Sequence, residues 1–198
     1  MTVGTNQQKN GKDQSWRGLL ISSWVMSLCL FGDALIYIVL PVNAEQFGVS
    51  LVWVGILLSA NRIIRTFTYG WIAHLSEWIG LRNLCILASS TAVLSTAGYG
   101  LLEGGWPLLA ARVLWGLSYA GLLLVTLAYA AQDRAKTGTR VGVSRAVEQI
   151  GPLVAMTAGT WLAGIVGAKD VFLYLAVGSA LILPLSLLLP TRDHDGPP

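Results

Sequence analysis

The chain has 198 residues, of which 54% are hydrophobic and 12% are charged, and its mean hydropathy is +0.62. The charged share is about half that of a soluble domain, and the basic residues lie scattered between apolar runs, which excludes a nucleic-acid partner. Cys29 and Cys85 both fall inside apolar runs, so the cysteines indicate neither a disulfide framework nor a metal site.

Six apolar segments are each long enough to span a bilayer. They cover residues 19–40, 51–75, 83–102, 107–131, 141–166 and 171–189. Because the links between them are short, neighbouring segments run antiparallel. The sequence therefore predicts an all-α polytopic membrane protein, with a six-helix bundle over 19–189 and tails over 1–18 and 190–198. A cleaved signal peptide is the rival interpretation of the first segment, but that apolar run is too long and contains Asp33.

The basic residues in or beside the links and tails fall almost entirely on one side of the predicted bundle. One side holds Lys9, Lys12, Arg17, Arg82, Arg134, Lys136, Arg140, Arg145 and Arg192. The opposite side holds only Lys169. Basic residues favour the cytoplasmic side of a membrane. We therefore expect both termini to be cytoplasmic, in a multi-pass protein of the inner (cytoplasmic) membrane.

Charged residues also occur inside the membrane segments, where a charge is costly unless it faces a partner or a polar cavity. They are Asp33, Arg62, Arg65, Arg112 and Glu148, on the first, second, fourth and fifth segments. The segments 83–102 and 171–189 carry none between their ends. This distribution predicts four inner and two outer helices, arranged as two inverted three-helix repeats around a polar interior that holds a solute.

Each polar residue in these segments has a structural and a functional interpretation. Asp33 and Arg112 could form an ion pair between two helices or contact the solute. Asn61, Arg62 and Arg65 share one sector of a helix, and an arginine pair without an adjacent acid favours a role in the cavity. Glu148 could pair with Arg145 or carry a proton. These alternatives, and a cavity role for Gln149 beside Glu148, remain open at this stage.

Three motifs resemble those of one family. The link after the second segment has the spacing G-x-x-x-D-[RK]-x-G-[RK]-[RK]: Gly80 and Arg82 match, Glu77 keeps the acid, and Ala73, Trp78 and Leu81 depart. Arg112 is followed by Gly116 on the fourth segment, and the fifth contains Gly151-Pro152, as in proton-driven exporters. In this order, the motifs resemble the N-terminal half of a major facilitator superfamily transporter.

The resemblance implies a secondary active transporter, in which two six-helix halves rock around a central site. It implies that Ala73, Glu77, Gly80 and Arg82 belong to a cytoplasmic latch between the halves. It also implies a small polar or amphipathic solute, with protons as a candidate coupling ion and antiport as a candidate mode. The second half would be a companion chain or an identical copy; the remaining interpretation is a fragment without transport activity.

The fifth segment carries small residues at every fourth position: Gly151, Ala155, Gly159, Ala163 and Gly167. Such a stripe, with Pro152 beside it, allows close helix packing, and we expect it to contact the second half, unlike a lipid-facing position such as Ala176. The rival interpretation is a non-transporting subunit or scaffold that binds a partner through this helix. Motifs of metalloproteases, serine hydrolases and nucleotide-binding loops are missing, so we expect no enzymatic activity and no cofactor.

Overall fold

The helices of the structure follow the apolar runs of the sequence. The structure is a computed structural model that describes residues 3–181 and 183–189, with side chains from residue 14 onward; the predicted tail at 190–198, which includes Arg192, lies outside the described residues. Every element in the described ranges is helical, which confirms the predicted all-α fold. The elements are α1 (Val3–Val42), η1 (Ala44–Phe47), α2 (Leu51–Leu101), α3 (Gly105–Ala130), η2 (Arg134–Lys136), α4 (Thr137–Val154), η3 (Ala155–Gly159), α5 (Thr160–Val166), α6 (Asp170–Ala180) and α7 (Leu183–Leu187).

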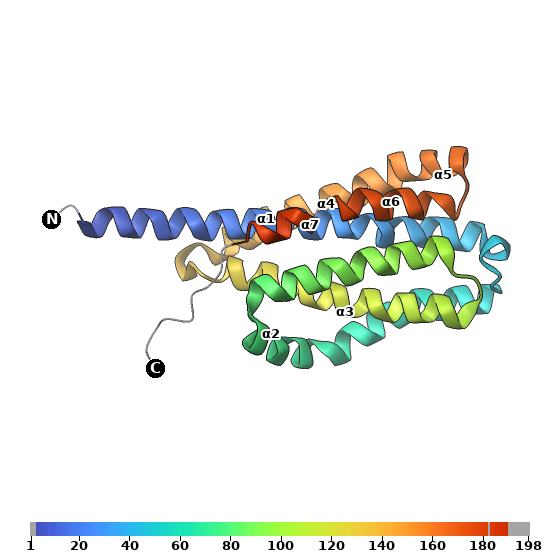
Figure 1. The fold of residues 1–198 in the computed structure, drawn as a ribbon, viewed down its shortest axis with the longest axis horizontal. Helices are drawn as coiled ribbons and strands as arrows, with labels where there is room; N and C mark the ends of the chain where they lie inside the picture. Colours follow the sequence, from blue (N-terminus) through green and yellow to red (C-terminus); the bar gives the residue numbers. More distant parts are fainter. Residues whose placement is uncertain (1–2, 182, 190–198) are drawn as a thin grey trace.

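The long helix α2 contains two of the predicted segments. It is broken at Gly80, whose φ of 80° and ψ of 158° lie in a region that is essentially restricted to glycine. Figure 1 shows the chain turning back at this break, so that the part over 51–79 and the part over 81–101 run in opposite directions. We call them the first and second legs of α2. Five helical stretches of the described chain are long and apolar enough to cross a membrane, and the break divides the α2 stretch into two crossings.

The fifth predicted segment is interrupted midway, since α4 and α5 are joined by the π-helix η3. Pro152 lacks the N–H that would close a helical hydrogen bond. Immediately before it, the Gly151 N–H donates to Ser27 Oγ of α1, over 2.8 Å. The interruption therefore lies close to where the helix backbone contacts α1, as π-bulges often lie at specialised positions of a helix.

The small-residue stripe of this segment packs inside the bundle. Gly151, Ala155 and Gly159 are buried; a side chain at 151 would overlap the Ser27 backbone carbonyl, and one at 159 would press on Leu35. The expectation that the stripe contacts a second half is therefore wrong for these three positions, because α1 occupies that side. Ala176, expected to face lipid, is also buried.

The start of α1 lies within the predicted N-terminal tail. The tail expected over 1–18 is helical from Val3. Arg140 connects the end of this tail to the bundle. Arg140 Nη2 donates to the Ser15 backbone oxygen (2.9 Å), to Ser15 Oγ (2.6 Å) and to the Tyr129 backbone oxygen (2.8 Å). Its guanidinium carbon also lies 4.9 Å from the centre of the Trp16 ring. A residue that the sequence placed in a cytoplasmic link is thus a buried connector of α1, α3 and α4.

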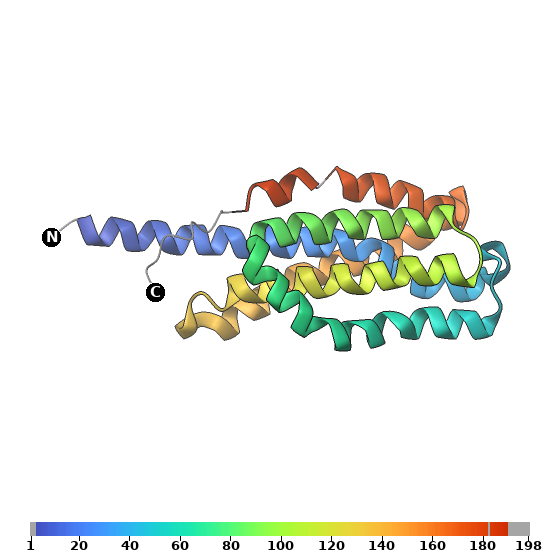
Figure 2. The same cartoon turned by 60° about the horizontal axis from the view of Figure 1, so that its bottom comes forward.

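Two apolar clusters make up the core, one at each end of the bundle. One contains Leu30 and the other contains Leu35, so Asp33 on α1 lies between them. Figure 2 shows the second leg of α2 beside α6, where Gly100 approaches Leu173 closely. Asp33 therefore lies midway along the bundle, between its two apolar ends.

Candidate functional site

Charged and polar side chains from three crossings meet around Asp33. Its carboxylate accepts from Arg112 Nη1 of α3 at 2.6 Å, and from Asn61 Nδ2 at 3.1 Å and Arg65 Nη2 at 3.4 Å, both of the first leg of α2. Arg65 Nε also donates to Asn61 Oδ1 over 2.9 Å. We call Asp33, Asn61, Arg65 and Arg112 the Asp33 cluster. The ion pair that the sequence offered as one interpretation of Asp33 and Arg112 is present.

Arg112 is the most deeply buried cation of the cluster. Arg112 is 0% exposed, and its Nε donates to the Leu57 backbone oxygen over 3.1 Å. That carbonyl belongs to the first leg of α2, so Arg112 joins the leg to α3 independently of the carboxylate. A buried charge requires a counter-charge and hydrogen bonds to be tolerated, and Asp33 supplies the counter-charge here.

Tyrosine rings surround the two guanidinium groups. The Arg65 guanidinium carbon lies 3.4 Å from the centre of the Tyr119 ring, and that of Arg112 lies 5.0 Å from Tyr37 and 5.8 Å from Tyr99. Such contacts stabilise a cation through the ring quadrupole. Tyr99 belongs to the second leg of α2, a segment predicted to be an outer helix without a role in the site.

Two of these tyrosines, Tyr37 and Tyr119, could have been identified from the sequence. Tyr37 lies four residues after Asp33, and Tyr119 lies seven residues after Arg112, so each shares a helix face with a cluster residue. The spacing of the aromatic residues relative to the buried charges would have identified both.

Arg62, predicted to act together with Arg65, lies apart from the cluster. Its side chain is exposed, whereas Arg65 is half-buried against Asp33. Three residues on a helix still differ in direction by about 60°, which is enough to turn Arg62 away from the cluster. The predicted arginine pair is therefore divided, and Arg65 has the adjacent acid that the sequence did not reveal.

Glu148 forms a second polar group, separate from the Asp33 cluster. Its carboxylate accepts from Ser144 Oγ and from Arg145 Nη1, each over 2.8 Å, and Ser144 Oγ lies 2.8 Å from Ser23 Oγ of α1. Ser23 is ten residues before Asp33 on α1, or about 15 Å along the helix. Glu148 therefore pairs with Arg145, as one of the open interpretations had it. Gln149, expected to line the same cavity, is exposed.

The residues of the predicted latch lie around the Gly80 turn. Gly80 makes the turn itself, Glu77 lies 3.4 Å from His74 Nδ1, and Arg82 is half-buried. Ala73 lies on the first leg, one turn before Glu77. Trp78, which stands where the motif has a basic residue, is 80% exposed. In this bundle the motif therefore forms a tight turn between two crossings.

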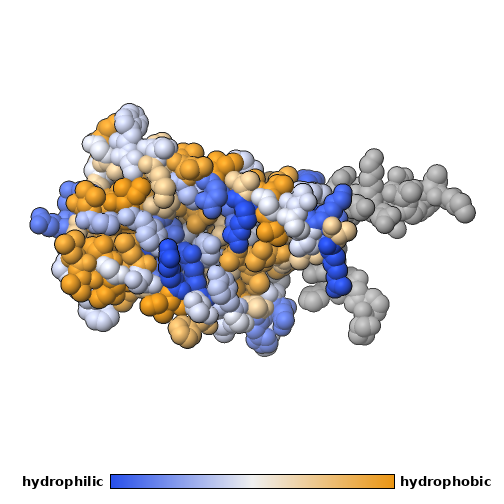
Figure 3. All heavy atoms as spheres, turned by 180° about the vertical axis from the view of Figure 1, so that it is seen from behind, coloured by the Kyte–Doolittle hydropathy of each residue, from blue (hydrophilic) through white to orange (hydrophobic). Residues whose placement is uncertain are grey.

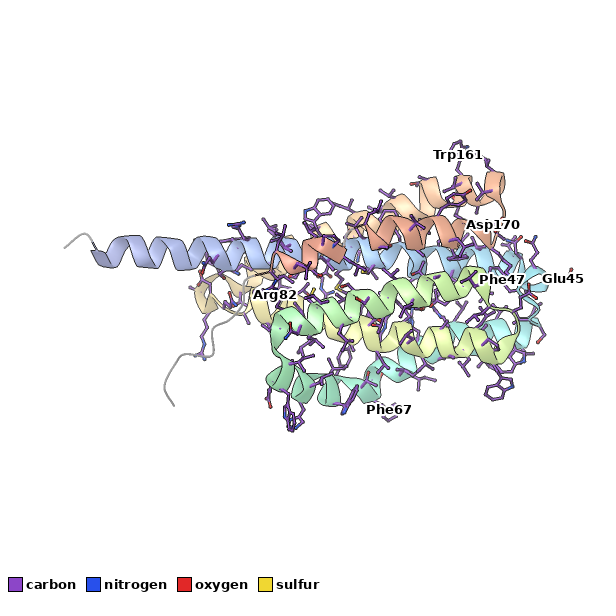
Figure 4. The ribbon with its side chains drawn as sticks, viewed as in Figure 1. Glu45, Phe47, Phe67, Arg82, Trp161 and Asp170 are labelled. Atoms are coloured by element: carbon purple, nitrogen blue, oxygen red, sulfur yellow. The ribbon has the colours of Figure 1, made fainter. Side chains whose placement is uncertain are left out.

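The faces of the bundle around these groups are largely apolar. Figure 3 shows hydrophilic side chains between apolar ones midway along one face, and Figure 4 shows Phe67 and Trp161 projecting away from the bundle on opposite sides. An apolar groove of about 650 Å³ runs between the first leg of α2 and α3, lined by residues such as Ile56, Ile63 and Val113. Every residue that lines this groove is uncharged, and none belongs to the Asp33 cluster.

A model of a known protein family matches most of the chain. The family model described as Major Facilitator Superfamily matches residues 23–198. The match therefore includes all four residues of the Asp33 cluster. A search of curated proteins gave no match.

Proposed function

This chain belongs to the major facilitator superfamily, and we propose from that premise that it forms the N-terminal half of a secondary active transporter. The transported species would be a small polar or amphipathic solute, moved by alternating access between two halves. The observation that carries the proposal is the Asp33 cluster, since charged groups inside membrane crossings are costly and typically serve a transported solute or ion.

The proposed transporter needs a second six-helix half, either a companion chain or an identical copy. Large apolar side chains on the first leg of α2 and on α5 are exposed in the single bundle, among them Phe67, Trp71, Trp161 and Ile165. A second half and lipid would cover such surfaces. The scaffold interpretation depended on the small-residue stripe of the fifth segment, and three of its five positions, Gly151, Ala155 and Gly159, are buried on the side of α1. We therefore favour transport.

We further propose an inner-membrane protein with cytoplasmic termini. Three links lie together at one end of the bundle: Gly104 N–H donates to the Phe47 backbone oxygen over 2.9 Å, and Lys169 Nζ lies 2.6 Å from Glu103 Oε1. Figure 4 shows Glu45 and Asp170 at this same end and Arg82 toward the other. Basic residues gather with Arg82, and this bias supports a cytoplasmic location for that end.

Reporter fusions test this orientation. Fusions after Asn43, Gly105 and Lys169 should all report the external side, because the three positions lie at the end with few basic residues. An alkaline phosphatase reporter, active outside, and a green fluorescent protein, fluorescent inside, give opposite signals at each position. A cytoplasmic signal after Gly105 would contradict the six-crossing arrangement.

Transport is tested by a comparison in which the solute need not be identified beforehand. In cells that make the chain, mass spectrometry of cell extract and medium should reveal at least one small molecule whose distribution differs from that in cells without it. The Arg65→Gln variant should lose this difference, because Arg65 is the partly exposed cation of the Asp33 cluster. Gln149→Ala, at an exposed neutral position, should retain it. Identical profiles for the wild-type and Arg65→Gln chains would contradict the proposed function.

A further inference from the structure

The Asp33 cluster contains two guanidinium groups and one carboxylate. Arg65 and Arg112 share Asp33. Glu148, which is buried on α4, is paired with Arg145 and does not contact the cluster. The cluster therefore has a surplus of one positive charge in a position where an unbalanced charge is costly.

The contact between Arg65 and Asp33 is the weaker of the two ion pairs. Its N–O distance is 3.4 Å, against 2.6 Å for Arg112 and Asp33, and the Arg65 side chain is 18% exposed where that of Arg112 is 0%. If Arg65 Nη2 leaves Asp33, the carboxylate keeps both Arg112 and the amide of Asn61, and Arg65 Nε can keep its bond to Asn61 Oδ1. Arg65 can therefore exchange Asp33 for another acceptor while the rest of the cluster stays paired.

A second observation also indicates that the cluster lacks a hydrogen-bond acceptor. Arg112 Nη2 is fully buried, and in the described part of the chain no group accepts a hydrogen bond from it. A buried donor without an acceptor is unfavourable, more so on a charged group. The cluster thus has both a surplus charge and a surplus donor.

Tyr69 gives access to this part of the cluster from outside the bundle. It lies four residues, about one helical turn, after Arg65 on the first leg of α2, and it is 38% exposed. Arg65 lies near the middle of the first leg of α2, about 15 Å from either membrane surface in a core of about 30 Å. Anionic lipid headgroups lie at those surfaces, too far away to reach Arg65. An anion that contacts Arg65 at this depth is therefore a dissolved solute.

We propose that the solute is an organic anion with a carboxylate, sulfonate or phosphate group, and that Arg65 binds this group. The inference rests on the proposed transport function and adds the charge of the solute to it. One negative charge balances the surplus charge of the cluster, and the Tyr119 ring against the guanidinium holds Arg65 in place for a bidentate contact. Arg112 is a positioning residue, because it keeps Asp33 occupied when Arg65 turns to the anion.

Charged thiol reagents measure the preference directly. In a Tyr69→Cys variant, a negatively charged methanethiosulfonate reagent (sulfonatoethyl) is compared with a positively charged one (trimethylammonium-ethyl), each normalised to its rate with a free thiol. Cys29 and Cys85 are buried, so their background labelling is low. We expect the anionic reagent to be favoured about tenfold, the lower range of enrichment by a charged cleft.

Matched variants separate Arg65 from general effects. In the Tyr69→Cys background, Arg65→Gln should abolish most of the preference, Arg65→Lys should keep most of it, and the remote charge-matched change Arg17→Gln should leave it unaltered. Retention by Arg65→Lys shows that position 65 tolerates substitution and that the positive charge carries the preference. Equal labelling by the two reagents, or a preference that Arg65→Gln leaves unchanged, would overturn the proposal.

The charge inference and the proposed function can fail separately. In the mass-spectrometric comparison, the molecule whose distribution depends on Arg65 should be an anion. A cation or a neutral molecule there would support transport and overturn the inference. Anionic labelling that depends on Arg65, together with no redistributed molecule, would support the anion site and overturn transport.

Discussion

Removing the carboxylate of Asp33 should destabilise the bundle more than removing its partner Arg112. Asp33→Asn leaves two guanidinium groups, one of them fully buried, without a counter-charge. Arg112→Gln leaves Asp33 with Arg65 and Asn61. Breaking a buried ion pair by removing one partner typically costs about 3–5 kcal/mol, a large part of the stability of a folded protein. We expect Asp33→Asn to reach the top of this range and Arg112→Gln to stay near its lower end.

A double-mutant cycle measures the coupling between the two residues. The free energy of unfolding is determined in mixed micelles for the wild type, both single variants and the double variant. Because the double variant removes both charges together, its loss of stability should be smaller than the sum of the single losses. Additive losses would show that the contact between Asp33 and Arg112 contributes nothing to stability.

The second large effect is expected at Gly151. An alanine there would place its Cβ against the Ser27 backbone carbonyl of α1, a group that cannot rotate away. The helix must then shift and lose the Gly151 N–H bond to Ser27 Oγ. Overpacking of this kind costs about 1–3 kcal/mol, and a leucine should reduce the folded yield further.

Gly164 on α5 is the matched control. A Cβ at this position meets no atom within 4 Å, so Gly164→Ala should be neutral or stabilising, by up to about 1 kcal/mol from helix propensity. Thermal unfolding in detergent compares the two alanine variants directly. Equal melting temperatures would contradict the close contact between α4 and α1.

The sequence was sufficient to predict the helical crossings and the residues at the centre of the site. Apolar run length determines the number of crossings, because hydrocarbon thickness sets a minimum length. The cost of a charge in lipid identified Asp33, Arg65 and Arg112 individually. Their separations along the chain, 79 residues for Asp33 and Arg112, carry no local signal of contact, so the pairing was one of several open interpretations.

Directions of side chains around each helix were less predictable. A stripe of small residues shows that some backbone comes close, but it does not show which one, and α1 took the place expected for a second half. Arg140 was assigned to a link by its position in the chain, yet it is buried against Trp16. Both outcomes depend on which helices pack together, and this information resides in tertiary contacts.

The turn at Gly80 has a consequence for how the chain enters the membrane during its synthesis. One residue between two helical legs provides no slack, so residues 51–101 must partition from the ribosome into lipid as a single hairpin. A segment with Arg62 and Arg65 near its centre bears a penalty of about 2.5–3.5 kcal/mol for each arginine on its own. The second leg is uncharged from Asn83 to Leu101, so its insertion into lipid offsets part of that penalty, and the helix over residues 51–101 is apolar enough to cross a membrane. The glycine therefore lets an arginine-bearing crossing reach the bilayer before α3 has been made and its Arg112 can complete the Asp33 cluster.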